Sequence, residues 1–269
     1  MRYLIAKPSA FLAPYIKQYW MIDNTLSEGV NHIQSIVPSG LMELTFHFAD
    51  LPEPISGSGH LRDQITISGQ SNRHFDLTVS GHLNMFSITF QAQGAGRFFS
   101  IPLNELCNQT IPLRFIQDQS ISKIHAELTN TKSFKEKIEL IESFLLQRFM
   151  NNFNSLACAR IDDSLKAINQ NPGLLNVDEL ASRACLSRKQ YERNFSECIG
   201  ISPKQFLRVI RFQQAIYKKQ QNPDLSLTAL AADCDYYDQS HMIAEFRQLT
   251  GRTPTQFFNE CDPYSDYFS

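Results

Sequence analysis

Lys189 and Arg193 are basic residues four positions apart in a stretch whose apolar residues recur with helical spacing. Tyr191 and Phe195 accompany them, so we expect a helix that buries both aromatic rings and exposes both cations along one ridge. A guanidinium on such a ridge can donate to O6 and N7 of guanine together in the major groove of DNA. The alternative is a solvated charged face, which would be the default interpretation for an isolated helix.

The elements that would position this ridge favour the DNA interpretation. Ser187 with Gln190 three residues later is a capping-box pattern that predicts a helix start, and Asn176 with Glu179 predicts another one upstream. Only the short turn Cys185-Leu186 lies between the two predicted helices. A helix, a tight turn and a helix in this order form the motif that places its second helix in the major groove.

The same module is repeated later in the chain. The heptad Gly200–Phe206 returns 51 residues later as Gly251–Phe257. In both copies glycine suits the left-handed position after a helix end, and the Ser-Pro or Thr-Pro pair that follows supplies the cap and first residue of another helix. In the second copy Asp238 is a good N-cap for a helix over Gln239–Leu249. A long helix from Phe206 to about Gln221 is expected to join the two modules.

The N-terminal half has the two-residue alternation of antiparallel strands. Apolar and polar residues alternate from Leu41 to Phe48, which predicts a half-buried strand, and residues 65–68, 75–80 and 85–92 have similar patterns. Turn residues such as Gly57-Ser58-Gly59 separate them. We expect a small antiparallel β-barrel or sandwich with helices, so the whole chain falls in the α+β class.

An amphipathic helix is expected over Phe134–Phe149, because apolar residues recur there every three or four positions. This stripe is either the seam of a homodimer or a cover for the barrel of its own chain. The polar segment Asn151–Ser155 follows as the predicted linker. We therefore divide the chain into an N-terminal β-rich domain at 1–155, a helical domain at 156–258 and an acidic tail at 259–269.

The composition sets limits on the class of protein. With 269 residues, 42% of them apolar, the chain has room for two ordinary domains. The formal net charge is -2, and residues 160–258 carry a weak positive bias of 13 Lys and Arg against 11 Asp and Glu. The six cysteines lack metal-binding spacing and are expected to be reduced. The sequence has no apolar run of membrane-spanning length and no signal-peptide pattern, so we expect a cytoplasmic protein without a membrane partner.

Histidines of the predicted barrel raise the question of a metal site. Imidazole is a common metal ligand, but no His-x-His pair or ligand-spaced carboxylate accompanies His47, His60, His74 and His82. We therefore expect surface or strand-face histidines, with no metal and no cofactor. A small-molecule pocket inside the barrel is the better alternative, although the sequence does not show which residues would line it.

The residues of the helical half also match a known family. The matching positions are Leu180-Ala181, Ser187 with Arg193 and Phe195, the first heptad, Arg211 with Ala215, Tyr236–His241, Phe246-Arg247 and Gly251–Pro254. Over about 100 residues they resemble the AraC/XylS transcription regulators. The N-terminal half is similar to the sensor domain of one AraC subgroup, at Pro38–Gly40, Gly69–Ser71, Gly94-Ala95, Phe98-Phe99 and Ile101–Leu103.

The resemblance implies a bacterial transcription regulator, not an enzyme, whose two recognition helices enter major-groove segments about 34 Å apart. The first helix is expected to contact DNA through Ser187, Arg188, Lys189, Gln190, Glu192 and Arg193. The second is expected to do so through Asp238, Gln239, Ser240, His241, Ile243 and Ala244. Phosphate contacts are expected from Lys204, Gln205, Thr255 and Gln256. By position in the family, the bases are read by Lys189 with Arg193 and by Ser240 with Ala244.

The sequence departs from the family mainly in the second module. Asp235 replaces the usual turn glycine, Met242 the usual aromatic residue, and Ala244 a common basic residue. The exposed face of the second helix is therefore poor in charge, and we expect the first helix to dominate specificity.

The partners implied are double-stranded DNA and, for the N-terminal domain, a small-molecule effector or a second copy of the chain. An interaction adaptor with a weakened DNA-binding face is an alternative function. A metal-dependent barrel enzyme or a cysteine alkyl acceptor is a weaker one, because the sequence offers no ligand cluster or nucleophile–base pair.

Overall fold

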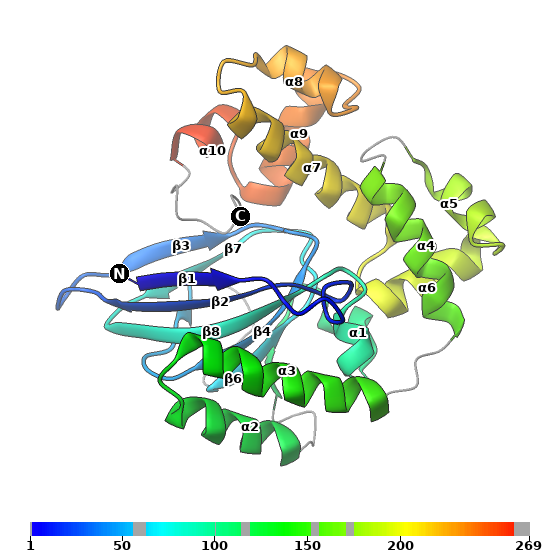
Figure 1. Ribbon diagram of the computed structural model, residues 1–269. Coiled ribbons are helices and arrows are strands. Elements are labelled where there is room, and N and C mark those ends of the chain that lie inside the picture. Colours follow the sequence, from blue (N-terminus) through cyan, green and yellow to red (C-terminus); the bar gives the residue numbers. More distant parts are fainter. Residues whose placement is uncertain are drawn as a thin grey trace. The chain divides into compact units, whose positions relative to one another are not determined.

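The computed structural model describes residues 2–55, 63–99, 101–113, 119–151, 156–170 and 175–260 (Figure 1). The chain divides into two compact units. One contains most of the first 155 residues. The other contains the chain from Leu156 onward, together with the short segments Val37–Gly40 and Ser71–His74.

The first unit is built on two antiparallel sheets. The larger sheet has the strand order β1-β2-β8-β4-β6-β9, and the smaller has the order β3-β7-β5. The strands are β1 (Arg2–Ala6), β2 (Ile16–Thr25), β3 (His32–Ile36), β4 (Met42–His47), β5 (Glu53–Pro54), β6 (Ile65–Ser68), β7 (Phe75–Val79), β8 (His82–Phe90) and β9 (Thr110–Pro112). The four predicted strands correspond to β4, β6, β7 and β8. The predicted turn at Gly57-Ser58-Gly59 and His60 lie outside the described residues.

Strand β4 is buried on both faces, so the prediction of a half-buried strand was wrong. Its apolar face belongs to the core of the unit, but Thr45 and His47 on the other face are also only 8% and 5% exposed. Thr45 is satisfied there by Ser87, with 3.0 Å between the hydroxyl oxygens. Burial, aided by the nearby His125, lowers the pKa of His47 to about 4. Polar residues on this face therefore lie in the interior, which alternation alone cannot reveal.

Helices α2 (Gln119–Asn130) and α3 (Phe134–Asn151) cover one face of the larger sheet (Figure 1). The predicted apolar stripe of α3 packs into the core of the unit, where Ile141 and Leu145 are fully buried. The stripe thus covers its own sheet, and this removes it as the seam of a dimer. The helix α1 (Ala95–Phe98) and the short 3-10 helix η1 (Leu103–Leu106) lie between β8 and β9 in the chain.

The second unit is helical. Its helices are α4 (Leu156–Gln170), α5 (Val177–Arg183), α6 (Arg188–Ile199), α7 (Pro203–Gln221), α8 (Leu227–Asp233), α9 (Gln239–Thr250) and α10 (Pro254–Glu260). The helices predicted for this half are confirmed, and together with the sheets they confirm the α+β class. The linker residues 152–155 and the tail beyond Glu260 lie outside the described residues.

Helix α7 connects two small aromatic cores. Near its start Phe206 packs on Phe195 of α6, with 5.5 Å between ring centroids. One turn and a half further on, Phe212 packs on Phe246 of α9 at 4.9 Å. All four rings are at most 1% exposed. The two helix-turn-helix modules are therefore each anchored to the same long helix through apolar burial.

One expectation about the cysteines was wrong. Cys158 of α4 and Cys198 of α6 form a disulfide, with 5.8 Å between their Cα atoms. The two residues are 40 positions apart on different helices, so their proximity depends on helix packing and leaves no local spacing signal. Cys107, Cys185 and Cys234 form no disulfide, as expected.

Candidate nucleic-acid interface

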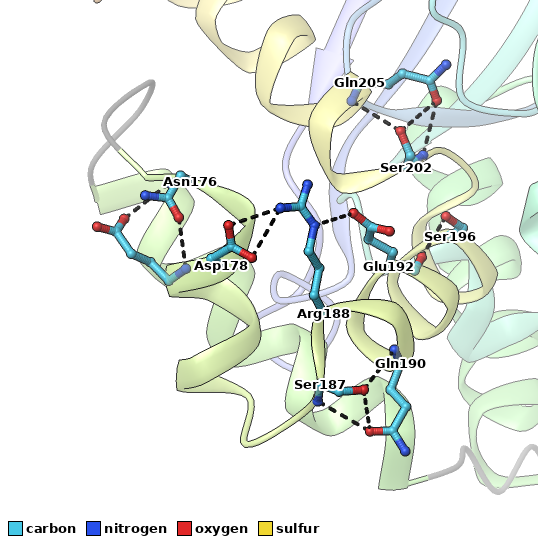
Figure 2. Close-up of polar contacts among 10 residues, drawn as sticks. Asn176, Asp178, Ser187, Arg188, Gln190, Glu192, Ser196, Ser202 and Gln205 are labelled. Atoms are coloured by element: carbon cyan, nitrogen blue, oxygen red, sulfur yellow. Dashed lines mark hydrogen bonds and ion pairs between the residues drawn. The ribbon is translucent and has the colours of Figure 1, made fainter.

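The first recognition helix, α6, starts at a complete capping box. Ser187 has extended backbone angles, and its Oγ accepts from the backbone N–H of Gln190 at 3.4 Å. The Gln190 side chain returns the contact, because its Oε1 accepts from the backbone N–H of Ser187 at 3.3 Å (Figure 2). The predicted helix start is thus confirmed. The side-chain oxygen of Gln190 is used in the cap, so only the side-chain amide nitrogen remains to bind DNA.

Arg188 is paired on the protein surface with two carboxylates. Its guanidinium lies between Asp178 of α5 and Glu192 of α6, at 3.0 Å and 3.1 Å (Figure 2). These groups are all more than 40% exposed, so solvent screens both ion pairs and they add little to stability. Arg188 and Glu192, both predicted to contact DNA, are therefore placed as a strut between α5 and α6.

Lys189 and Arg193 form the exposed ridge that the sequence predicts. Both are exposed, whereas Tyr191 and Phe195 of the same helix are fully buried. Within the described part of the chain, neither cation has a hydrogen-bond or ion-pair partner. Burial raises the pKa of Tyr191 to about 12. The tyrosine is thus a neutral anchor, and the two cations are left to the solvent side.

The two heptads adopt the same local structure. Gly200 and Gly251 end α6 and α9 with φ of 103° and 73°, a left-handed conformation that glycine adopts without strain. After each glycine a hydroxyl and a glutamine cap each other, Ser202 with Gln205 and Thr253 with Gln256. Gln205 and Gln256, predicted to contact phosphates, thus serve primarily as helix caps.

The other two predicted phosphate contacts are Lys204 on α7 and Thr255 on α10. Both side chains are exposed, and within the described ranges of the chain neither has a hydrogen-bond or ion-pair partner. Each is the second residue of its helix and follows the proline that begins it, Pro203 or Pro254. These two residues remain available to a ligand.

The turns of the two modules also correspond. Cys185 and Asp235 have φ of 52° and 56°, so each occupies the left-handed position where the family usually has glycine. Aspartate tolerates this conformation better than most residues, and the strain at cysteine is of order 1 kcal/mol. The departures noted in the sequence therefore leave the helix-turn-helix geometry intact.

The second recognition helix, α9, has a bare outer face. Asp238 caps it by accepting from the backbone N–H of His241 at 2.7 Å, and Gln239 is engaged by the hydroxyl of Thr228 at 2.8 Å. Ser240 and Ala244 are exposed, and Ile243 is half-buried. Of the positions expected to read bases here, only the Ser240 hydroxyl can make a hydrogen bond.

His241 is positioned by the protein rather than free to read bases. The backbone N–H of Tyr237 donates to Nδ1 of the ring at 3.2 Å, so a neutral ring carries its proton on Nε2. That nitrogen lies 3.4 Å from a carboxylate oxygen of Glu245. The ring thus connects the turn before α9 to the interior of the module.

Glu245 is the centre of a buried ion-pair cluster that the sequence did not reveal. Its side chain is 7% exposed, and Oε1 receives Arg208 at 3.0 Å and Arg211 at 2.8 Å, both from α7. Arg211 also lies over the ring of Tyr236, 4.9 Å from its centroid. Burial and the carboxylate of Glu245 raise the pKa of Tyr236. Glu245 therefore faces α7 rather than the exposed side of α9.

Tyr237 is a further candidate that sequence reasoning did not assign to the site. It directly precedes the cap of α9 and is 92% exposed. The sequence shows two adjacent tyrosines directly before Asp238, and only Tyr236 is buried in the structure. The second tyrosine of the pair is the signal that sequence reasoning could have used. Aromatic rings at such positions can pack on sugars or thymine methyl groups.

Two family models match the chain. Residues 180–260 match a helix-turn-helix domain, and residues 5–112 match a domain of unknown function (DUF6597). An uncharacterized HTH-type transcriptional regulator of Haemophilus influenzae is 31% identical over 99 residues, which are 36% of this chain and 33% of that protein. The HTH-type transcriptional activator RhaS of Pectobacterium carotovorum is 29% identical over 80 residues, 30% of this chain and 28% of RhaS. Residues 180–260 thus form a helix-turn-helix domain of the AraC type.

With one relative the similarity covers more residues than the helical domain contains. The Msm operon regulatory protein of Streptococcus mutans is 23% identical over 158 residues, 58% of this chain and 56% of that protein. The chain thus spans about a third of the Haemophilus protein and just over half of the Streptococcus one. Among solved structures, ToxT from Vibrio cholerae aligns with a TM-score of 0.47 at 12% identity, covering 90% of this chain and 98% of ToxT.

The described residues contain neither a candidate metal site nor a candidate membrane-spanning helix. Among the described residues, no three His, Cys, Asp or Glu side chains are grouped so that they could hold a metal ion. Within the same residues, none of the helices combines the length and apolar character needed to span a membrane.

Proposed function

We propose that the chain is a sequence-specific DNA-binding transcription regulator whose main base-reading surface is the ridge of Lys189 and Arg193. One observation carries the proposal: both cations are exposed and unpartnered in the described part of the chain, on a helix whose start is fixed by a capping box. The other charged side chains in the first half of that helix, Arg188 and Glu192, are paired within the protein. A pre-positioned guanidinium and ammonium are the groups that recognise guanine in the major groove.

The second module supports the same function in a lesser role. Helix α9 would enter the next major-groove segment, about 34 Å away along the DNA, if both helices lie on one face of the duplex. There Ser240 and Tyr237 are the exposed groups that can contact bases or sugars, and Ala244 offers no hydrogen bond. Lys204 and Thr255 would contact the backbone.

For the rest of the chain the proposal follows the family. Residues 1–155 would sense a small-molecule effector or mediate self-association, and residues 156–258 would bind DNA. The relatives named as regulators and activators of bacterial transcription support this division, and also a cytoplasmic location without a catalytic role. An effector site in the N-terminal unit would have to lie away from the α3 stripe, which is packed against the sheet.

The test is selection of DNA by the purified full-length protein. Fragmented genomic DNA from a bacterial host that carries the gene is incubated with the protein at about 0.15 M salt, and bound fragments are sequenced. We expect a shared sequence in two segments about one helical turn apart. Enrichment no greater than that of random fragments would contradict the function and favour the adaptor alternative.

A further inference from the structure

The disulfide of the helical unit is attached to the helix that carries the exposed ridge of Lys189 and Arg193. Cys198 is the second-last residue of α6, and Cys158 lies in the first turn of α4. Arg193 precedes Cys198 on the same helix by about 7.5 Å along the helix axis. A change at the disulfide therefore acts on the same rigid element as the ridge.

The second module has an apolar pair where the first has the two cysteines. At the offset of 51 residues that relates the two heptads, Cys158 corresponds to Val209 of α7 and Cys198 to Leu249 of α9. Val209 and Leu249 are 0% and 1% exposed and belong to one apolar core. Apolar burial holds two helices together under all redox conditions, whereas a disulfide does so only while it is oxidised. The connection is thus permanent in the second module and reversible in the first.

A thiol in solution can reach the bond from the side of α4. Cys158 is half-buried, whereas Cys198 is only 8% exposed. Exchange begins when a thiolate attacks a sulfur atom that it can reach, so Cys158 is the site of attack and Cys198 provides the leaving group.

The other described cysteines of the helical unit do not compete for this bond. Cys185 lies before α6, at least about 15 Å along the helix axis from Cys198. Cys234 is 2% exposed, and burial raises the pKa of its thiol, so little of the reactive thiolate forms. The pair of Cys158 and Cys198 therefore forms a closed redox couple within the described part of the unit.

The surroundings of the bond depend on the proposed function, because a bacterial transcription regulator acts in the cytoplasm. Low-molecular-weight thiols keep most cysteines reduced there. A disulfide between two helices then persists only when the balance of thiol and disulfide shifts toward oxidation. Such a bond responds to the redox state of the cell in addition to supporting the fold.

We propose that the Cys158–Cys198 disulfide is a redox switch that couples the thiol–disulfide balance of the cell to DNA binding by α6, which rests on the regulator function proposed above. Opening takes two exchanges with a low-molecular-weight thiol such as glutathione. The first glutathione thiolate bonds to Sγ of Cys158 and displaces Sγ of Cys198 as a thiolate. A second one attacks the bound glutathione sulfur, which releases Cys158 as a thiolate and leaves oxidised glutathione.

The reaction is balanced and reversible. The protein gains two electrons and its two thiolates take up two protons, while two glutathione thiols become one disulfide. Oxidised glutathione reverses both exchanges. No other reactant is needed.

Reduction should loosen α6 without unfolding it. The helix keeps its capping box at Ser187 and the contact of Phe195 with Phe206, neither of which involves the disulfide. Its carboxyl-terminal end loses the covalent connection to α4, and the 40-residue segment between the cysteines regains freedom. We expect the affinity for the specific site to fall about tenfold, within the range typical of coupling between two sites. Random duplex should be less affected, because the proposed phosphate contacts of Lys204 and Thr255 lie outside α6.

The test follows the bond and the DNA affinity in the same samples. Full-length protein is equilibrated under nitrogen in mixtures of reduced and oxidised glutathione, and free thiols are trapped by alkylation and counted by mass spectrometry. Competition gel shifts at fixed salt measure the affinity for the selected duplex and for random duplex. We expect the specific affinity to follow the fraction of disulfide, to fall about tenfold on full reduction, and to recover when oxidised glutathione is added back.

Three variants assign the response to this bond. Cys158→Ser should bind at the reduced level in every mixture, because no disulfide can form. Cys158→Val combined with Cys198→Leu installs the apolar pair of the second module, and should bind independently of glutathione and close to the oxidised level. Cys185→Ser is the matched control, because it removes the exposed thiol of the same module and should keep the full response. Circular dichroism establishes that each protein is folded, and the reduced unmodified protein provides the measurement if a variant is not.

The outcomes distinguish failure of the switch from failure of the regulator function. Equal affinity for the selected duplex while the bond opens overturns the switch and leaves the function standing. A bond that stays open or stays closed in every glutathione mixture does the same, as does a response that Cys185→Ser abolishes. A reduced protein that loses its helix content also overturns the switch, because the bond would then only support the fold. Selection of no DNA in either redox state contradicts the regulator function itself.

Discussion

The two helix-turn-helix modules share their scaffold and differ in where they place their charges. Both have a left-handed turn residue, a capped recognition helix, a glycine stop and a hydroxyl–glutamine cap after it. In the first module the ion pairs of Arg188 are exposed and Lys189 and Arg193 remain free. In the second the ion pairs converge on buried Glu245, and the outer face has no free cation at Ser240 or Ala244.

This difference shows that a repeated scaffold does not imply a repeated role. Exposed ion pairs contribute little to stability, so the first module depends on its aromatic core and on the disulfide. Buried ion pairs fix geometry but make stability depend on every partner. The second module is thus built to hold α9 firmly on α7, and the first to present charge to a partner.

The largest expected effect comes from breaking the buried cluster. Glu245→Gln leaves Arg208 and Arg211 without their shared carboxylate and should lower the free energy of unfolding by about 2–4 kcal/mol. Asp178→Asn in the first module breaks an exposed pair and should cost less than about 1 kcal/mol. Urea unfolding measures both, and hydrogen exchange should show faster exchange in α9 only for Glu245→Gln. Equal losses would remove the distinction between buried and exposed pairs.

The disulfide should stabilise the first module alone. Cys158→Ser removes a cross-link that closes 40 residues, and we expect a loss of about 2–4 kcal/mol. Cys185→Ser, at an exposed free thiol in the turn, should change stability by less than about 0.5 kcal/mol. A reductant should produce the first loss in the unmodified protein and none in Cys158→Ser. Unchanged unfolding with and without reductant would show that the bond does not matter to the fold.

Base recognition should depend on the ridge of α6. Arg193→Ala should weaken the selected site by about 1–3 kcal/mol and leave random duplex nearly unaffected, because a base contact is lost. Lys204→Ala should weaken both equally, as a phosphate contact would. Competition gel shifts with specific and random DNA separate the two patterns. If specific affinity survives in Arg193→Ala, α6 is not the reader.

A substitution in the second module should increase its preference for particular bases. Ala244→Arg places a guanidinium on the exposed face of α9 at the position corresponding to Arg193, and should sharpen base preference there by about 1 kcal/mol. Ala244→Gln is the control that adds length without charge. The measurement compares the affinities of duplexes that differ only under α9. An arginine that raises affinity for every sequence alike would indicate a backbone contact instead.

Local patterns explain what could be predicted from the sequence. The capping boxes of Ser187 and Asn176 depend on residues three positions apart, and the strand Ile65–Ser68 was found at its observed bounds. Non-local contacts explain the errors. Glu245 meets Arg208 and Arg211 across 37 and 34 positions, and Cys158 meets Cys198 across 40. Those contacts depend on how the helices pack, whereas the hydrophobic periodicity of the sequence indicates only that a helix is present.

The candidate site was predictable in the same uneven way. The exposed ridge follows from helical spacing, because buried Tyr191 and Phe195 fix the opposite face. The engagement of Gln190 follows from the capping-box spacing, but that of Arg188 and Gln239 does not, since Asp178 and Thr228 lie 10 and 11 positions away on another helix. A composition count therefore overstates the charge available to DNA on both helices.

The central claim is that the first module dominates specificity, and systematic base substitution across the bound site tests it most directly. Each base pair of the selected DNA is changed in turn, and the affinity of the full-length protein is measured at fixed salt. We expect losses of about 1–3 kcal/mol per changed pair under α6 and markedly smaller losses under α9. Equal losses in the two segments, or larger ones under α9, would contradict the account.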